Sequence, residues 1–129
     1  MEMKLSAIES ERVFYDALCN GLYYISGYGL QLDWNDAEYK EAKKQCLNEM
    51  VEPCIEDILY KMLLMGYGLT LIDIECEGEY TRTITIKDVH ERVSLAPAEV
   101  VLEMFREEGD ANTADIIIQT VFYKEIIFG

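Results

Sequence analysis

The chain has 129 residues, a length that suits one domain, and its 25 acidic and 11 basic residues give a net charge of −14. Half of its residues are hydrophobic, which excludes an acidic disordered segment because such segments are poor in apolar residues. We therefore expect one folded domain over residues 1–129, with an acidic surface that attracts basic proteins and repels nucleic acid and anionic membranes.

The N-terminal part of the chain predicts a helix followed by a strand. Apolar residues recur at helical spacing over residues 6–26, and Gly27 is a suitable residue to end an amphipathic helix. Leu30, Leu32 and Trp34 then alternate with polar residues. This alternation is typical of a short strand with one buried face.

Two more helices are expected in the next part of the chain. Asn35 and Glu38 have the spacing of a capping box, so Asn35 should begin a polar helix that extends to about Met50. Its lysines are interleaved with acids, and we interpret them as part of a solvated face: Lys40, Lys43 and Lys44. Pro53 suits the first position of a more apolar helix, which Gly66 should end.

A β-hairpin is predicted after this helix. Residues 69–76 and 79–87 read as its two strands, joined by a two-residue turn at positions 77–78. This turn gives the hairpin one aliphatic face. It also sets Asp73 opposite Arg82, where the two side chains should form a cross-strand ion pair.

Two short helical segments follow the hairpin. Asp88 and Glu91 have capping-box spacing and predict a helical turn that carries His90. Another helix should start at Pro97 and end at Gly109. Four of its residues are expected to face inward: Val101, Leu102, Met104 and Phe105.

The last segment of the chain is predicted to be a helix that begins near Asn112 and Asp115. Its β-branched residues favour a strand, but its length and cap favour a helix. As a helix it is apolar on nearly all sides, through Ile116, Ile117, Ile118, Val121, Phe122, Ile126, Ile127 and Phe128. A helix of this kind needs cover on two sides, from the rest of the chain or from a second copy. We expect a symmetric homodimer through this C-terminal segment.

One short sequence occurs twice. Residues 27–32 (Gly-Tyr-Gly-Leu-Gln-Leu) recur as residues 66–71 (Gly-Tyr-Gly-Leu-Thr-Leu), each after an apolar helix and before a strand. Phosphate-binding glycine loops have the reverse order, with the strand first and the helix last. We therefore interpret the repeat as two similar helix–strand units that lie side by side in one sheet. Together the elements predict an α+β domain, with a small, mostly antiparallel sheet of three strands covered by about five helices.

The residues that most often carry chemistry are sparse. The four cysteines have no metal-binding spacing: Cys19, Cys46, Cys54 and Cys76. No signal peptide is evident, so we expect reduced thiols and a cytoplasmic protein. His90 is the only histidine, in a charged turn without a nucleophile motif. We expect no metal, no cofactor and no catalytic residue.

Two groups of carboxylates are candidate contacts for a basic partner. The first lies at the predicted hairpin tip: Asp73, Glu75, Glu77 and Glu79. The second lies on the helix after Pro97 and just beyond it: Glu99, Glu103, Glu107, Glu108 and Asp110. The first three residues of this second group are four apart, which places their carboxylates about 6 Å apart in one ridge. Such a row resembles the phosphates of a DNA backbone.

These features favour a non-catalytic acidic module that binds a protein with a basic surface. The most concrete version is a DNA mimic that occupies a nucleic-acid-binding protein. The alternative is a structural or regulatory homodimer that uses the C-terminal segment and has no basic partner. A metal-dependent hydrolase that uses the hairpin carboxylates is a weaker third interpretation.

Overall fold

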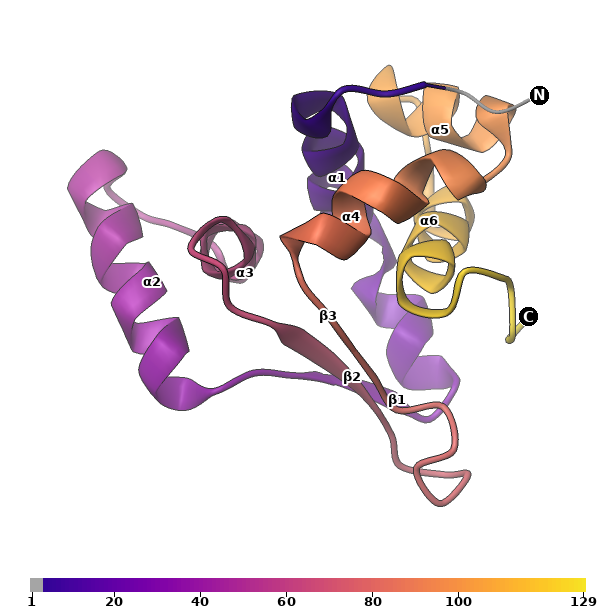
Figure 1. Ribbon diagram of the computed structural model, residues 1–129, viewed down its shortest axis with the longest axis horizontal. Coiled ribbons are helices and arrows are strands. Elements are labelled where there is room, and N and C mark those ends of the chain that lie inside the picture. The colour runs from indigo at the N-terminus through magenta and orange to yellow at the C-terminus, as the bar shows by residue number, and fades with distance from the viewer. Residues whose placement is uncertain (1–3) are drawn as a thin grey trace.

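A three-stranded antiparallel sheet and seven helices make up residues 4–129, the part of the chain that the computed structural model describes (Figure 1). The architecture is α+β, in one compact domain, as predicted. In chain order the elements are α1 (Ala7–Gly27), β1 (Leu30–Asp33), α2 (Asp36–Glu49), α3 (Ile55–Leu64), β2 (Leu69–Asp73), β3 (Arg82–Ile84), α4 (Ile86–Arg92), the 3₁₀ helix η1 (Val93–Leu95), α5 (Ala98–Phe105) and α6 (Ala111–Tyr123). No helix among these is long and apolar enough to cross a membrane.

The repeated sequence forms two helix–strand units, as predicted. Strands β1 and β2 are antiparallel neighbours, and Leu32 of the first unit lies opposite Leu71 of the second. The two units use their glycines differently. Helix α1 continues through Gly27, and Gly29 then adopts φ +77°, whereas α3 ends earlier and Gly66 adopts φ +88°. The left-handed residue is therefore the second glycine of one unit and the first glycine of the other.

The hairpin between β2 and β3 differs from the prediction by two residues. Leu69 lies opposite Ile84, and Leu71 lies opposite Arg82. The predicted ion pair of Asp73 with Arg82 is therefore wrong, and a loop over residues 74–81 replaces the two-residue turn. A shift by two residues keeps every side chain on its own face, because side chains alternate with a period of two. The inner face is aliphatic as expected, since Leu69, Leu71 and Ile84 are fully buried.

Three helix starts also differ from the predictions, although Asn35 caps α2 as expected. Cys54 is the N-cap of α3, so Pro53 lies before the helix and not at its first position. Thr85 is the N-cap of α4, and Asp88 accepts a hydrogen bond from its backbone N–H. Asp110 caps α6 by accepting a bond from the N–H of Thr113. Several residues near each of these starts could serve as a cap, and the pattern alone did not select among them.

The C-terminal segment is a helix, as predicted, but it ends at Tyr123, and Lys124 adopts φ +66°. Helix α6 lies against α1 along much of its length, and α4, α5, η1 and β3 cover its other sides (Figure 1). Other elements of the same chain therefore supply the second cover that was expected from a homodimer. The uncovered helix face that motivated the homodimer prediction is not present in residues 4–129, and the homodimer itself stays a prediction.

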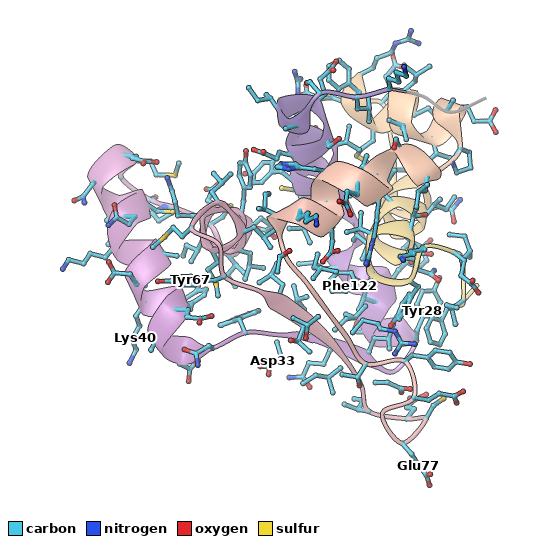
Figure 2. The ribbon with its side chains drawn as sticks, viewed as in Figure 1. Tyr28, Asp33, Lys40, Tyr67, Glu77 and Phe122 are labelled. Carbon is cyan, nitrogen blue, oxygen red and sulfur yellow. The ribbon has the colours of Figure 1, made fainter. Side chains whose placement is uncertain are left out.

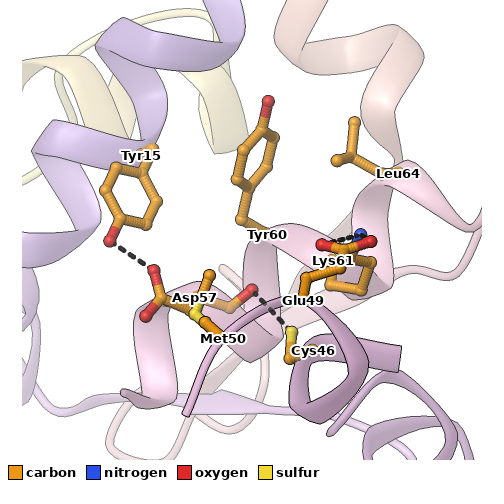
Figure 3. A pocket seen from close by; sticks show the side chains of 8 residues that line it. All are labelled: Tyr15, Cys46, Glu49, Met50, Asp57, Tyr60, Lys61 and Leu64. Carbon is orange, nitrogen blue, oxygen red and sulfur yellow. Dashed lines mark hydrogen bonds and ion pairs between the residues drawn. The ribbon is translucent and has the colours of Figure 1, made fainter. Parts of the chain in front are cut away.

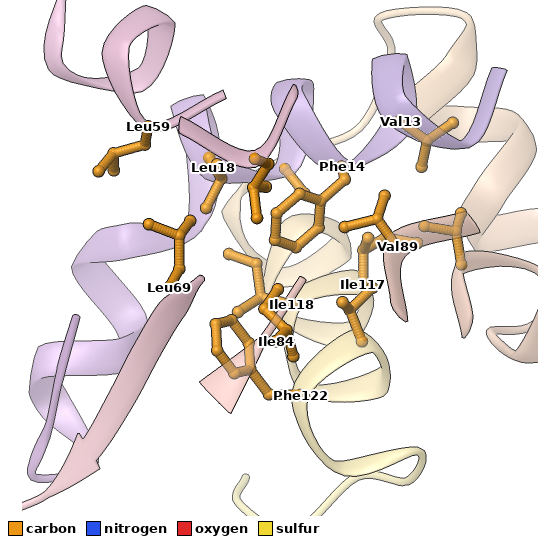
Figure 4. Packing of buried hydrophobic residues seen from close by; sticks show 14 of the residues in the cluster. Val13, Phe14, Leu18, Leu59, Leu69, Ile84, Val89, Ile117, Ile118 and Phe122 are labelled. Carbon is orange, nitrogen blue, oxygen red and sulfur yellow. The ribbon is translucent and has the colours of Figure 1, made fainter. Parts of the chain in front are cut away.

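The main hydrophobic core lies between α1, α6 and the inner face of the sheet (Figure 4). Phe14 and Leu18 of α1 meet Ile118 and Phe122 of α6, all of them at most 2 % exposed. The two helices lie close together at Gly21. A Cβ atom there would lie 2.9 Å from the Cβ of Ala114, so any larger residue forces its neighbours to shift.

Helix α2 stands apart from this core (Figure 1). It packs on α3, and only Ala42 and Cys46 of its residues are buried. Lys40 points away from the rest of the molecule (Figure 2). The interpretation of the α2 lysines as a solvated face is therefore confirmed, because all three are exposed.

A short tail follows α6 and is attached to it by Gln119, which is 1 % exposed. The Gln119 carbonyl oxygen accepts hydrogen bonds from the N–H groups of Ile127 and Phe128, at 2.9 and 2.8 Å. Its amide nitrogen donates to Asp115 and to the Phe128 carbonyl. The Phe128 ring stacks on Tyr28 at 5.3 Å between centroids. Phe128 is therefore held against the body of the protein, although it does not belong to a helix as predicted.

Candidate functional site

The hairpin loop over residues 74–81 presents the most prominent acidic group. Glu75, Glu77 and Glu79 are exposed, and none of them has an ion pair with any residue from 4 to 129. Glu77 lies at the far tip of the loop, away from the body of the protein (Figure 2). Ile74, at the base of the loop, is 62 % exposed. The loop therefore combines three unpaired charges with one exposed aliphatic side chain.

Asp73 builds this loop from within. Its carboxylate accepts hydrogen bonds from the backbone N–H groups of Cys76 at 2.8 Å, Glu75 at 3.0 Å and Tyr80 at 3.1 Å. These bonds, led by the one from Cys76, lower the pKa of Asp73. Because the residue is only 4 % exposed, its carboxylate is not available to a partner. The prediction of Asp73 as a surface contact is therefore wrong, because its carboxylate holds the backbone of the loop that carries the glutamates.

Arg82 is the cation nearest to the loop in sequence, but it does not neutralise the glutamates. Its guanidinium donates to the backbone carbonyls of Glu79 and Thr81, at 3.0 and 2.8 Å. It also lies 5.9 Å from the centre of the Tyr123 ring. The positive charge therefore helps to hold the loop, and the glutamate side chains keep their charge exposed.

The second acidic group does not form the expected ridge. Helix α5 ends at Phe105, not at Gly109, and Glu107 adopts φ +61° in the turn that follows. Glu99 and Glu103 are thus the only two of its acids on the helix. Leu102, expected to face inward, is 38 % exposed. The early end of α5 removes the third member of the row, so the regular phosphate-like spacing is absent.

Several acids of this group already have partners. Glu107 pairs with Arg12 of α1 at 3.2 Å, and Glu103 accepts a hydrogen bond from the Thr113 hydroxyl at 3.2 Å. Asp110 caps α6. Glu99 and Glu108 are exposed. The two acidic groups also lie at opposite ends of the molecule, with α5 at the top and the hairpin loop at the bottom of Figure 1. They form two separate surfaces.

A half-buried polar cluster joins three helices and has no counterpart in the predictions. The Glu11 carboxylate of α1 binds His90 Nε2 of α4 at 2.7 Å and accepts a hydrogen bond from the Tyr60 hydroxyl of α3 at 2.7 Å. His90 was expected in a polar cap, and the structure corrects this because the residue is paired with Glu11. The two residues are 79 positions apart, so no sequence spacing relates them.

A pocket of about 320 Å³ lies beside this cluster, between α1, α3 and the end of α2 (Figure 3). The Tyr15 hydroxyl donates to Asp57 at 2.6 Å, and the Tyr15 and Tyr60 rings are 5.6 Å apart. The other side chains at its wall are Cys46, Glu49, Met50, Lys61 and Leu64. Lys61 is paired with Glu49 at 2.8 Å. Each charged side chain of the pocket therefore already has a partner within it.

Burial and hydrogen bonding raise the pKa values of three groups that line this pocket. The hydrogen bond to Asp57, together with burial, raises the pKa of Tyr15. Burial and the bond to Glu11 raise the pKa of Tyr60 to about 12. Burial likewise raises the pKa of the Cys46 thiol. These groups keep their protons near neutral pH, so they are poor bases and poor nucleophiles.

The cysteines outside the pocket follow the same trend. All four cysteines are free, and burial is the largest cause of a raised pKa at Cys19, Cys54 and Cys76 as well. Among the described residues no three His, Cys, Asp or Glu side chains are grouped so that they could hold a metal ion. Family models, curated proteins and solved structures gave no match to this chain.

Proposed function

We propose that the protein is a non-catalytic binding module for a protein partner with a basic surface, and that the hairpin loop over residues 74–81 is its contact. The observation that carries the proposal is the contrast within this loop. The charged side chains of Asp73 and Arg82 form hydrogen bonds with backbone groups of the loop. The glutamates at 75, 77 and 79 are exposed on the same loop and have no ion pair with any residue from 4 to 129.

Preorganisation makes this loop a suitable contact. Three bonds to one carboxylate fix its backbone before any partner arrives. A partner then meets charges that are already in place, and less conformational entropy is lost on binding. Exposed charges of one sign also accelerate association with an oppositely charged protein and make it sensitive to salt.

The raised pKa values of the four cysteine thiols keep them protonated near neutral pH, which fits a binding role better than thiol catalysis. Four free thiols are consistent with a reducing compartment, and a cytoplasmic location is part of the proposal. The more specific version concerns the partner, which we propose to be a nucleic-acid-binding protein whose basic groove the loop occupies. Since α5 lacks a regular acidic row, this mimicry would rest on the three hairpin glutamates.

A charge-neutralising variant tests the location of the contact. The probe is an octalysine peptide, and binding is measured by calorimetry at about 0.05 M and about 0.5 M salt. The variant replaces Glu75, Glu77 and Glu79 by Gln. The matched control makes the same change at three exposed acids elsewhere, namely Glu41, Glu52 and Glu125.

We expect affinity to fall with salt and to fall more in the hairpin variant than in the control. Equal losses would show that only net charge matters and would contradict the proposed contact. A flat response to salt would contradict an electrostatic contact of any kind. For the more specific version, a partner captured at low salt should be released by a DNA duplex; release by salt but not by the duplex would contradict mimicry.

A further inference from the structure

The free edge of β1 has hydrogen-bonding groups that point away from the sheet. The strand order β1-β2-β3 leaves one side of β1 without a neighbouring strand. The Ile74 N–H donates to the Gly29 carbonyl at 3.0 Å, which fixes the phase of the antiparallel ladder. In that phase the backbone groups of Gln31 and Asp33 face β2, and those of Leu30 and Leu32 face outward.

An apolar groove of about 250 Å³ lies beside this edge. It is lined by Leu22 and Ile25 of α1 and by Ile55 and Leu59 of α3. Residues of β1, and Trp34 just after it, complete the lining. The groove explains an asymmetry across the sheet.

Leu32 and Leu71 are cross-strand partners on the same face, yet Leu71 is fully buried and Leu32 is only half-buried. The neighbour that Leu32 lacks is one on the groove side. Ile55 shows the same incomplete cover, since it is 51 % exposed.

We propose that β1 accepts an extended peptide as a fourth strand, with apolar side chains in this groove and basic residues around them. The outward groups of Leu30 and Leu32 offer two donors and two acceptors to the added strand. The peptide residues opposite them place their side chains on the same face, over the groove. The peptide therefore alternates, with apolar residues at every second position.

Charge selects this occupant over a second copy of the chain. Two copies could pair β1 with β1, but each has a net charge of −14 and they repel one another. Acids stand at both ends of the edge. Glu75 lies against Gly29 at one end, and Asp33 and Asp36 are exposed at the other. A peptide with lysines at its ends matches these charges.

Trp34 makes the test direct, because it is the only tryptophan and it borders the groove. The probe is the peptide Lys-Val-Lys-Val-Lys with both ends blocked. Its binding is measured through the change in Trp34 fluorescence. Two control peptides have the same charge and nearly the same side chains: a scrambled one, and one with N-methyl groups on both valines, which removes the donors to β1. The protein variants are Ile55→Lys in the groove and Ile126→Lys outside it, which have nearly equal exposure of 51 % and 50 %.

We expect saturable binding with a dissociation constant below about 1 mM. Ile55→Lys should weaken it at least about tenfold, Ile126→Lys should have little effect, and N-methylation should abolish it. Equal binding of the N-methylated peptide, equal effects of the two variants, or no binding up to about 1 mM would each overturn the proposal. So would a dimer in sedimentation that Ile55→Lys dissociates, because a second copy would then cover the edge.

Discussion

Helices α2 and α6 have nearly the same length, 14 and 13 residues, but opposite surroundings. Nine residues of α6 are buried, and Asp115 is its only charged residue. In α2 only two residues are buried, and half of its 14 residues are charged. The same local structure thus serves as the centre of the core in one case and as an outlying limb in the other. Stability should be distributed accordingly, with α2 opening separately from the rest.

The largest expected effect is at the centre of α6. Phe122 is 2 % exposed, and Phe122→Ala leaves a cavity between α1, α6 and the sheet. We expect a loss of about 3–5 kcal/mol in the free energy of unfolding, measured with denaturant. The control is Leu47→Ala on α2, where the side chain is 53 % exposed and the loss should be within about 0.5 kcal/mol. Similar losses in both variants would contradict the contrast between the two helices.

The next effect concerns Asp57 of α3, which accepts a hydrogen bond from the Tyr15 hydroxyl of α1. The hydrogen bond from Tyr15 is the largest cause of the lowered pKa of Asp57. A carboxylate with a lowered pKa stabilises the fold above its unfolded pKa, about 3.9, and this contribution is lost as the pH falls through the folded value. Tyr15→Phe should therefore cost about 1.5–3 kcal/mol at pH 7 and should flatten the loss of stability below about pH 4. If the dependence of stability on pH were unchanged below about pH 4, the bond would not contribute to holding α3 against α1.

The crossing of α1 and α6 is tested by one added methyl group. Gly21→Ala brings a Cβ to 2.9 Å from the Cβ of Ala114, so the two helices must separate slightly. We expect a net loss of about 1–3 kcal/mol despite the better helix propensity of alanine. Gly27→Ala is the matched control, since a Cβ there meets nothing within 4 Å, and it should be neutral or slightly stabilising. Stabilisation by both changes would show that the crossing is not tight.

The smallest effect is confined to α2. Asn35 accepts a hydrogen bond from the Glu38 N–H at 3.0 Å as its N-cap. Asn35→Ala should lower the opening free energy of α2 by about 1 kcal/mol. Amide exchange measures this directly, and the slowest amides of α6 should keep their protection. A parallel loss of protection in α6 would mean that the two helices open together.

Element types followed from the sequence because periodicity reports which side of a segment is buried. The same periodicity cannot fix hairpin register, since a slip of two residues leaves Leu71 and Ile84 on the same face. The length of the loop depended instead on Asp73, whose three backbone bonds have no signature in the pattern. The end of α5 was missed for a similar reason, because Glu107 adopts a left-handed conformation that favours glycine.

The exposed glutamates of the hairpin were identified from the sequence, but their isolation from the α5 acids was not. The position of the α5 acids relative to the hairpin depends on how α5 packs against α6, and no local pattern of the sequence determines this packing. The pairing of Glu11 with His90 was also out of reach, because it requires α1 and α4 to meet. The groove beside β1 depends on the angle between α1 and α3, which no local pattern contains.

The clamp formed by Gln119 implies an order of events during folding. Gln119 and Asp115 are four residues apart and meet only once α6 has formed that turn. The segment around Phe128 can find its bonds only afterwards, so it docks late. Once docked, the segment should rarely detach, because detachment leaves the buried Gln119 amide without its hydrogen bonds to residues 127 and 128. An unsatisfied buried amide costs about 1–3 kcal/mol. The slowest step of this region in refolding should therefore be the docking of residues 124–129 onto the completed helix α6.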